Sequence, residues 1–390
     1  MIDLSEFQSI SPYTDEEASV ALGKLADHPL LSQFSSRFFP DESPDFLKLI
    51  LKNIKTVDQF QELVMSRFVE WALTHTAKNF SYDGISNLDP QKRFLALSNH
   101  RDIILDPAIM QLVLFRNGIP LTEIAVGDNL VSNESIEYLL RSNRMIKVIR
   151  GITARELYLS SQMLSKYIRL NITNQRSSIW LAQRQGRTKN GYDLTEQGLL
   201  KMLDMSGTAD FQQNFEELNI TPMSISYEYE PCDILKAREV VISRKHKYVK
   251  AEGEDLNSIL VGIQQYKGNI HLNIGTPLTS EEIAEAALCD KNDRYQQIRH
   301  AVDRRVIEGY RLWKNNYIAY DLLNQSYKYS HLYDPADVEQ FIAYMQKQLD
   351  TVEPEINRED LRRIFLDIYA NPVVTKELLE KEKVTGAILL

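Results

Sequence analysis

The chain has 390 residues, of which 43% are hydrophobic and 25% are charged, values that are ordinary for a globular protein of two or three domains. The formal net charge of −9 argues against a general nucleic-acid binder, which would carry a basic surface. Cys232 and Cys289 lie far apart and outside any C-x-x-C pair, so we expect neither a disulfide framework nor a structural zinc site. This cysteine usage fits a reducing, cytoplasmic compartment.

We expect neither a secretory signal nor a membrane-spanning helix in this sequence. Residues 1–7 have no basic n-region and no long apolar run, so we expect no secretory signal. The sequence also lacks an uninterrupted run of about 18 apolar residues, the length that spans a bilayer. Any membrane contact is therefore expected to be peripheral.

Residues 1–85 are expected to form an N-terminal helical region. Residues 14–17, Thr-Asp-Glu-Glu, fit a capping box, in which the Thr hydroxyl and a Glu carboxylate bind free N–H groups at a helix start. Further along, apolar residues recur at helical spacing and form one stripe: Phe60, Leu63, Val64, Phe68, Trp71 and Ala72. The stripe indicates packing on the bundle itself or on the next domain, with a membrane-lying face as the alternative.

Residues 86–280 are expected to form an α/β domain that begins after the polar stretch 81–93. Short apolar runs predict strands at 94–98, 121–126, 145–149, 178–182, 221–227 and 269–274. Helical patterns lie between them, near 106–116, 134–142, 153–172, 195–204, 233–241 and 254–265. This alternation predicts a largely parallel, mixed sheet flanked by helices. Ligands of such sheets bind beyond the carboxyl ends of the strands.

Residues 281–390 are expected to form a C-terminal helical extension. Apolar residues again recur along one helical stripe: Ile298, Val302, Val306, Tyr310 and Trp313. The tail from 335 to 390 has an amphipathic helical pattern as well.

His100 is the candidate general base. It follows the apolar run 94–97 directly, which places it at the carboxyl end of a strand. Asp106 and Pro107 then open a helical pattern, in which Asp suits the cap and Pro the first turn. A carboxylate at that position can hold the imidazole tautomer and stabilise the imidazolium that forms on proton abstraction. One His near one Asp is common, so this pair alone is weak support for catalysis.

Residues 100–103, His-Arg-Asp-Ile, imitate the catalytic loop of protein kinases. The kinase loop has Asn four residues after its H-R-D-L, whereas this chain has Pro107. The chain also has no Gly-rich phosphate loop before this segment and no D-F-G after it. These missing parts exclude the kinase interpretation.

Four sequence blocks in order resemble those of the glycerolipid acyltransferase superfamily, the glycerol-3-phosphate and 1-acylglycerol-3-phosphate acyltransferases. Residues 94–107 resemble the first block, N-H-R-S followed by an Asp. Residues 145–151 resemble the second, an apolar strand ending in Arg. Residues 185–191, Gln-Gly-Arg-Thr-Lys-Asn-Gly, resemble the third, E-G-x-R-S-x-x-G, and residues 220–228 resemble the fourth, a Pro-led strand ending in Tyr-Glu.

Two departures from the family pattern leave alternatives open. Five residues rather than four separate His100 from Asp106, so either Asp106 or Asp102 is the expected catalytic partner. The third block is one residue short and has Gln185 where the family has Glu. Gln can still donate and accept hydrogen bonds, so this change allows either an altered acceptor site or a weakened enzyme.

The resemblance implies which residues bind substrate, and the chemistry of arginine agrees with it. The implied set is Arg101, Arg150, Gln185, Gly186, Arg187 and Lys189. Arg150 and Arg187 each follow an apolar strand, so both should project over the sheet edge that carries His100 and bind a phosphate bidentately.

A second group of basic residues stands out in this acidic protein: Lys236, Arg238, Arg244, Lys245, Lys247 and Lys250. Such a run can dock an anionic bilayer surface or an acidic carrier protein. The alternative is an ordinary solvated face.

The expected function is transfer of a fatty acyl group from a thioester, either acyl-CoA or acyl carrier protein, to a hydroxyl of a glycerol-3-phosphate-like or lysolipid acceptor. The reaction belongs to phospholipid or related lipid biosynthesis and needs no metal and no bound cofactor, since His100 serves as general base. The alternatives are a catalytically weakened lipid-binding scaffold on the same fold and a His-dependent thioesterase. No nucleic-acid partner is expected.

Overall fold

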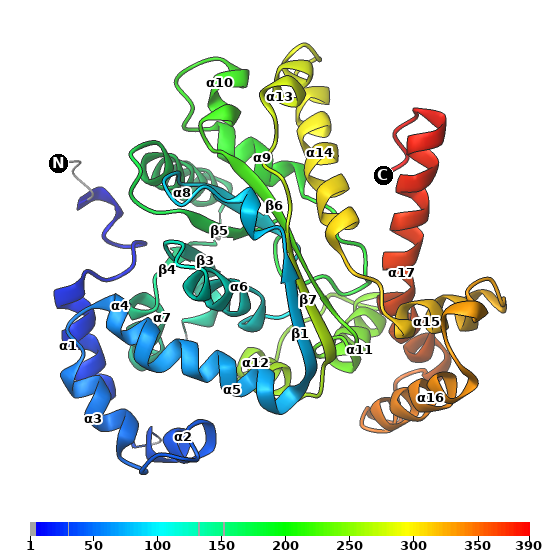
Figure 1. Cartoon of the computed structure of the whole chain (residues 1–390), viewed down its shortest axis with the longest axis horizontal. Helices are drawn as coiled ribbons and strands as arrows, with labels where there is room; N and C mark the ends of the chain where they lie inside the picture. Colours follow the sequence, from blue (N-terminus) through cyan, green and yellow to red (C-terminus); the bar gives the residue numbers. More distant parts are fainter. Residues whose placement is uncertain (1–4, 30, 132, 151–152) are drawn as a thin grey trace.

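The computed structural model describes residues 5–29, 31–131, 133–150 and 153–390. In this part of the chain, one mixed sheet contains seven strands in the order β1-β7-β6-β2-β5-β3-β4, with helices on both faces (Figure 1). Neighbouring strands are parallel except β6 and β7, which pair antiparallel. The protein is therefore an α/β fold with a largely parallel sheet, as the sequence predicts.

The strands are β1 (Ala77–Asp83), β2 (Leu95–Ser98), β3 (Glu123–Gly127), β4 (Met145–Val148), β5 (Ile179–Ala182), β6 (Ile220–Tyr227) and β7 (Gly268–Ile274). The helices before and within the sheet region are α1 (Asp15–Leu25), α2 (Leu31–Phe38), α3 (Phe46–Asn53), α4 (Val57–Phe60), α5 (Ser66–Thr76), α6 (Leu105–Arg116), α7 (Glu134–Ser142), α8 (Ala154–Thr173), α9 (Gln197–Asp204), α10 (Phe211–Glu216), α11 (Asp233–Ser243) and α12 (Glu254–Gln264). The C-terminal helices are α13 (Ser280–Ala287), α14 (Asp293–Gly309), α15 (Lys314–Asn324), α16 (Pro335–Leu349) and α17 (Arg358–Thr385). Short helical turns are η1 (Ser5–Phe7), η2 (Gln61–Met65, a π-helix), η3 (Ile85–Asn87), η4 (Asp128–Leu130) and η5 (Ser330–Leu332).

All six expected strands are present, and their ends differ from the prediction by at most about two residues. The sequence analysis missed β1, which we had placed in the helical region and the polar stretch after it. Its side chains are half-buried or exposed, because β1 is the edge strand and pairs only with β7. A polar edge strand has no apolar run and no clean alternation to reveal it. The three expected domains stay a prediction, although β1 brings residues before 85 into the sheet.

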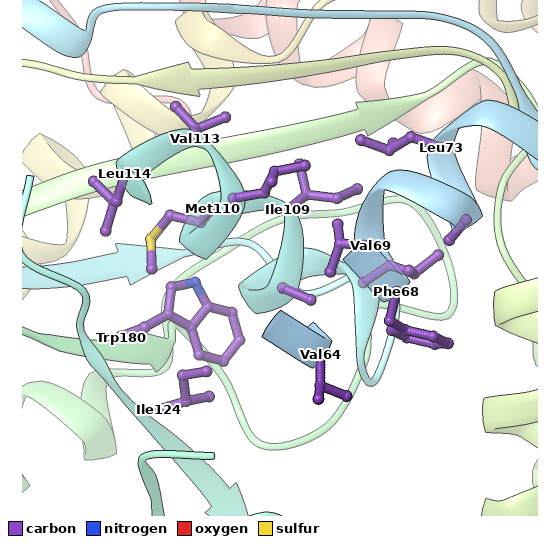
Figure 2. Packing of buried hydrophobic residues seen from close by; sticks show 14 of the residues in the cluster. Val64, Phe68, Val69, Leu73, Ile109, Met110, Val113, Leu114, Ile124 and Trp180 are labelled. Atoms are coloured by element: carbon purple, nitrogen blue, oxygen red, sulfur yellow. The ribbon is translucent and has the colours of Figure 1, made fainter. Parts of the chain in front are cut away.

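The central strand β2 is buried on both faces, as parallel strands usually are. Ala96 faces a cluster that includes α5 and α6. Leu95 and Leu97 point the other way, into a cluster that includes α8, α9 and α14. Figure 2 shows part of the first of these clusters, where Val69 of α5 lies beside Ile109 of α6. The predicted stripe at residues 60–72 packs both on the sheet domain and on the other N-terminal helices, where Phe38 contacts Phe68 and Trp71, and Leu63 is its exposed member.

No helix in the described ranges is long and apolar enough to cross a membrane. Helices α15, α16 and α17 form a third core cluster together with α11. Asp233, fully buried at the start of α11, accepts hydrogen bonds from the hydroxyls of Tyr344 (2.7 Å) and Tyr369 (2.6 Å). These two tyrosines belong to α16 and α17, so one carboxylate ties both helices to the sheet domain.

The stability of this attachment should depend on pH. Burial raises the pKa of Asp233 to about 6, so between about pH 4 and pH 6 the folded protein holds a proton that the unfolded chain has lost. The contribution of Asp233 to stability is therefore fully present below about pH 4 and falls as the pH rises to about 6. Relative to Asp233→Asn, which cannot ionise, the wild type should lose up to about 3 kcal/mol of unfolding free energy across this window. Urea unfolding at several pH values measures the difference, and a constant difference would contradict the prediction.

Candidate active site

His100 lies just beyond the carboxyl end of the central strand β2. The neighbouring parallel strands β5 and β6 end at the same edge of the sheet. The Nδ1 atom of His100 lies 3.1 Å from Oδ2 of Asp106, in the first turn of α6. The imidazole also makes an edge contact with Trp180 of β5, at 5.8 Å between ring centroids. The strand end and the helix start thus bring the predicted base and one predicted carboxylate together.

Asp106 is held by four donors. Its Oδ2 atom accepts hydrogen bonds from the backbone N–H groups of Arg101 (2.5 Å) and Asp102 (2.8 Å) and from Nδ1 of His100. Its Oδ1 atom accepts one from the hydroxyl of Tyr227 at 2.8 Å. Burial and the Asp106 carboxylate raise the pKa of Tyr227 well above its ordinary value, so this tyrosine stays neutral and donates. A carboxylate fixed in this way requires the proton of His100 on Nδ1, which leaves Nε2 free to accept another proton.

Asp102 makes a different set of contacts. Its Oδ1 atom accepts hydrogen bonds from the backbone N–H groups of Ile104 (2.9 Å) and Leu105 (2.8 Å), so it caps the start of α6. Its Oδ2 atom is buried without a hydrogen-bond partner and lies against Gly262, where an added Cβ would come within 2.2 Å of it. Of the two candidate partners, Asp106 is the one hydrogen-bonded to His100. The catalytic role of either residue stays a prediction.

Arg101 lies inside the protein, in a network of buried charges. Its side chain is fully buried. The guanidinium donates to Oδ2 of Asp193 from Nη2 (2.6 Å) and Nε (3.0 Å), and Nη1 lies 3.4 Å from Glu230. Lys236 is buried beside it and donates to Glu230 (2.6 Å) and to the backbone carbonyl of Arg101 (2.7 Å). This network supports the backbone next to His100, and the expected substrate contact of Arg101 does not fit it.

The segment after β5 runs beside the segment that carries His100. The backbone N–H of Gln183 donates to the carbonyl of Ser98, and that of Thr188 donates to the carbonyl of His100, both at 2.8 Å. Gly186 has φ +74°, a left-handed conformation that favours glycine. The side chain of Gln185 is exposed, and its backbone N–H donates to Glu196 at 3.2 Å.

Like Arg184, whose Nε atom is buried without a hydrogen-bond partner, Arg187 has unused donor capacity. Its Nη1 atom is buried and has no hydrogen-bond partner. Burial alone would raise the pKa of Asp255, but Lys250, Asn129 and Arg187 together hold that pKa below its ordinary value. The guanidinium of Arg187 therefore lies close enough to the start of α12 to act on the Asp255 carboxylate. Lys189, by contrast, pairs with Glu239 of α11. An anionic ligand group would satisfy the free donor of Arg187.

Arg150 follows β4, at the far edge of the sheet from β1. Its side chain leans back over β3, because an added Cβ at Gly127 would lie 2.8 Å from its Nη2 atom. Its backbone N–H donates to Asp128 at 3.2 Å. Residue 151, the last of the second block, lies outside the described residues.

Sequence reasoning missed two side chains of this region. The sequence gives Tyr227 no role beyond ending the fourth block, although its hydroxyl donates to the Asp106 carboxylate that faces His100. Gln183 is fully buried, and neither its Oε1 nor its Nε2 atom has a hydrogen-bond partner. A polar residue directly after a buried strand is the one signal that could have identified Gln183.

The predicted basic run is divided by the fold. Lys236 is buried in the network described above, which corrects our expectation that it contributes to a docking surface. Arg238 pairs with Glu353, and Lys250 pairs with Asp255. Arg244, Lys245 and Lys247 are exposed. Among the described residues, His, Cys, Asp and Glu side chains form no group of three or more that could hold a metal ion.

No family model and no curated protein matches this sequence. Among solved structures, the chain is similar to the 1-acyl-sn-glycerophosphate (LPA) acyltransferase PlsC from Thermotoga maritima, at 12% sequence identity. The match covers 75% of this chain and 94% of that chain, with a TM-score of 0.38. Because a score of this size does not establish a shared fold, the function proposed below depends on the sequence blocks and on the geometry of the site.

A substitution of Arg101 tests its place in the buried network. Arg101→Met should lower the free energy of unfolding by about 3–5 kcal/mol, because Asp193 and Glu230 would stay buried without their shared cation. Arg362→Met, at an exposed arginine of α17, is the matched control and should change stability by less than about 0.5 kcal/mol. Urea unfolding measures both. An Arg101 variant as stable as the wild type would return this residue to a ligand-binding role.

Proposed function

We propose that this protein is an acyltransferase that moves a fatty acyl group from a thioester to the hydroxyl of a glycerol-3-phosphate-like or lysolipid acceptor. The single observation that carries the proposal is the hydrogen bond between His100 and a buried, four-fold anchored Asp106 at the carboxyl end of the central strand. A base held in one tautomer, with Nε2 directed away from its carboxylate partner, suits removal of a proton from a hydroxyl. The order of the four sequence blocks supports the same chemistry.

In the proposed reaction, Nε2 of His100 accepts the proton of the acceptor hydroxyl while that oxygen attacks the thioester carbonyl carbon. A C–O bond forms, and the carbonyl becomes a tetrahedral oxyanion that nearby donors must stabilise. The C–S bond then breaks, and the departing sulfur takes the proton from the imidazolium of His100. Asp106 stabilises the imidazolium through Nδ1, and Tyr227 keeps Asp106 in place. No acyl-enzyme intermediate is part of this scheme.

The acceptor is proposed to carry a phosphate because Arg187 has a buried donor without a partner. Arg150 is proposed as a second phosphate ligand, since its guanidinium leans from β4 over β3 toward the centre of the sheet. Lys189 is engaged by Glu239 and would have to leave that ion pair to contribute. The donor is acyl-CoA or acyl carrier protein. Because the product is a lipid, we propose that the protein is cytoplasmic and contacts a membrane peripherally.

The general base is tested by His100→Ala. Transfer should fall by roughly 10²–10⁴-fold, the contribution of a positioned general base, while urea unfolding stays near that of the wild type. Asp106→Asn should lose more activity than Asp102→Asn, because only Asp106 is hydrogen-bonded to the imidazole. A folded His100→Ala protein with near-normal transfer would refute the mechanism.

The assay uses purified protein with a labelled acyl thioester, with and without glycerol 3-phosphate or a lysolipid. Labelled ester in the presence of acceptor supports the transferase. Free fatty acid alone would indicate the thioesterase. The absence of both products would indicate a lipid-binding scaffold. Gln185, at the position where the family pattern has Glu, favours that alternative.

The phosphate ligand is tested by Arg187→Met. The KM for a phosphorylated acceptor should rise by roughly 10–100-fold, which corresponds to loss of one charge-assisted hydrogen bond, and the KM for the thioester should change little. Arg93→Met is the control, because Arg93 precedes β2 and so lies at the opposite edge of the sheet. An unchanged acceptor KM would exclude Arg187 as the phosphate ligand.

A further inference from the structure

One side of helix α12 lies against the proposed active site. Gly262 contacts the buried Oδ2 atom of Asp102 so closely that an added Cβ would come within 2.2 Å of it. Ser258, one turn earlier, is buried on the same side and accepts a hydrogen bond from Cys232 through its carbonyl. At the start of the helix, Asp255 accepts a hydrogen bond from Asn129 of η4 at 3.0 Å. The helix therefore borders the site along much of its length.

The opposite side of α12 is apolar and exposed. Leu256 and Leu260 are 56% and 42% exposed, and their spacing of four residues puts them on one face of the helix. Val249, in the loop that leads into α12, is 79% exposed. These three aliphatic side chains gather on one helix and the loop before it, whereas isolated exposed apolar residues need no explanation.

Basic residues accompany this apolar face. Residues 244–251 contain Arg244, Lys245, Lys247 and Lys250 and no Asp or Glu, whereas Glu252, Glu254 and Asp255 follow at the start of α12. Arg244, Lys245 and Lys247 are exposed, and Lys250 also reaches the surface while pairing with Asp255. A local excess of cations is notable because the whole chain carries a formal net charge of −9. The loop is thus complementary to an anionic surface.

We propose that this α12 surface, made of Val249, Leu256 and Leu260 with Lys245 and Lys247, docks on an anionic lipid bilayer. This proposal rests on the proposed function, because a lipid product is the reason to expect membrane contact. It adds which part of the molecule makes that contact. Aliphatic side chains insert at the boundary of headgroups and acyl chains, while lysines keep their ammonium groups at headgroup level. Each lysine near an anionic surface adds electrostatic attraction to it.

Docking through the outer side of α12 has a consequence for the site. The inner side of the same helix contacts Asp102, which caps α6 beside His100. The bilayer would therefore lie next to the edge of the sheet that carries the proposed base and Arg187.

Co-sedimentation of the full chain with vesicles tests the proposal. The wild type should bind vesicles of phosphatidylglycerol and phosphatidylcholine much more strongly than vesicles of phosphatidylcholine alone, and added salt should weaken the binding by screening. Leu256→Ser/Leu260→Ser and Lys245→Glu/Lys247→Glu should each weaken it by at least about 10-fold, the ratio expected for loss of about 1.4 kcal/mol.

Matched controls separate this surface from general exposure. Leu288→Ser/Val384→Ser removes two apolar side chains that are 89% and 87% exposed on other elements, and Lys291→Glu/Lys381→Glu makes the same charge change at exposed lysines elsewhere. Both control variants should bind like the wild type. Equal binding by the α12 variants and the wild type would overturn the proposal, as would a wild type that ignores anionic vesicles. Binding of a soluble acidic carrier protein without vesicle binding would also overturn it and make the surface a protein-docking site.

Acyl transfer to a soluble acceptor without vesicles distinguishes failure of this surface from failure of the proposed function. The α12 variants should retain wild-type transfer in that assay, because Leu256 and Leu260 lie on the outer side of the helix and Lys245 and Lys247 are exposed in the loop before it. A wild type that binds anionic vesicles but transfers no acyl group would leave the surface intact and remove the acyltransferase.

Discussion

The buried carboxylate of Asp106 is the interaction on which the rest of the site depends. It faces His100 and accepts hydrogen bonds from two consecutive backbone N–H groups and from Tyr227. These donors come from three places in the chain: the end of β2, the turn into α6 and the end of β6. A carboxylate inside a protein is tolerated only when its oxygens are satisfied. The requirement to satisfy Asp106 therefore determines how strand, turn and helix meet, and with them where the imidazole lies.

A second set of buried charges supports the turn between β2 and α6. Arg101 and Lys236 pair with Asp193 and Glu230, with almost no exposure to solvent. Such ion pairs contribute little net stability, because removing charges from water is costly, but breaking one leaves an uncompensated charge. Their effect here is geometric. Lys236 binds the backbone carbonyl of Arg101, so α11 and the segment after β5 both restrain the residue that follows His100. The segment after β5 also carries Arg187, and α11 is followed by the loop that leads into α12.

Much of the fold could be predicted because its strands are buried on both faces. Leu95, Ala96 and Leu97 form an uninterrupted apolar run, and β5 shows the same pattern, which is typical of a parallel sheet. β6 is buried along its whole length as well, although it also contains Thr and Ser residues. Alternation with amphipathic helices then indicated the α/β class. The edge strand β1 could not be recognised, since a half-exposed strand with Asn79, Ser81 and Asp83 depends on its distant partner β7 rather than on its own residues.

The sequence by itself determined the succession of six of the seven strands with the main helices between them, the position of His100 at a strand end and the candidacy of Asp102 and Asp106, because these follow from local patterns of apolar and polar residues. Only the tertiary structure decided between the two carboxylates: Asp106 turns toward His100, while Asp102 caps α6 against Gly262. It also buried Arg101 and Lys236, engaged Lys189 and left Arg187 with a free donor. The physical reason is that the state of a charged side chain depends on partners far along the chain. Arg101 meets Asp193 and Glu230, and no local pattern records such long-range pairings.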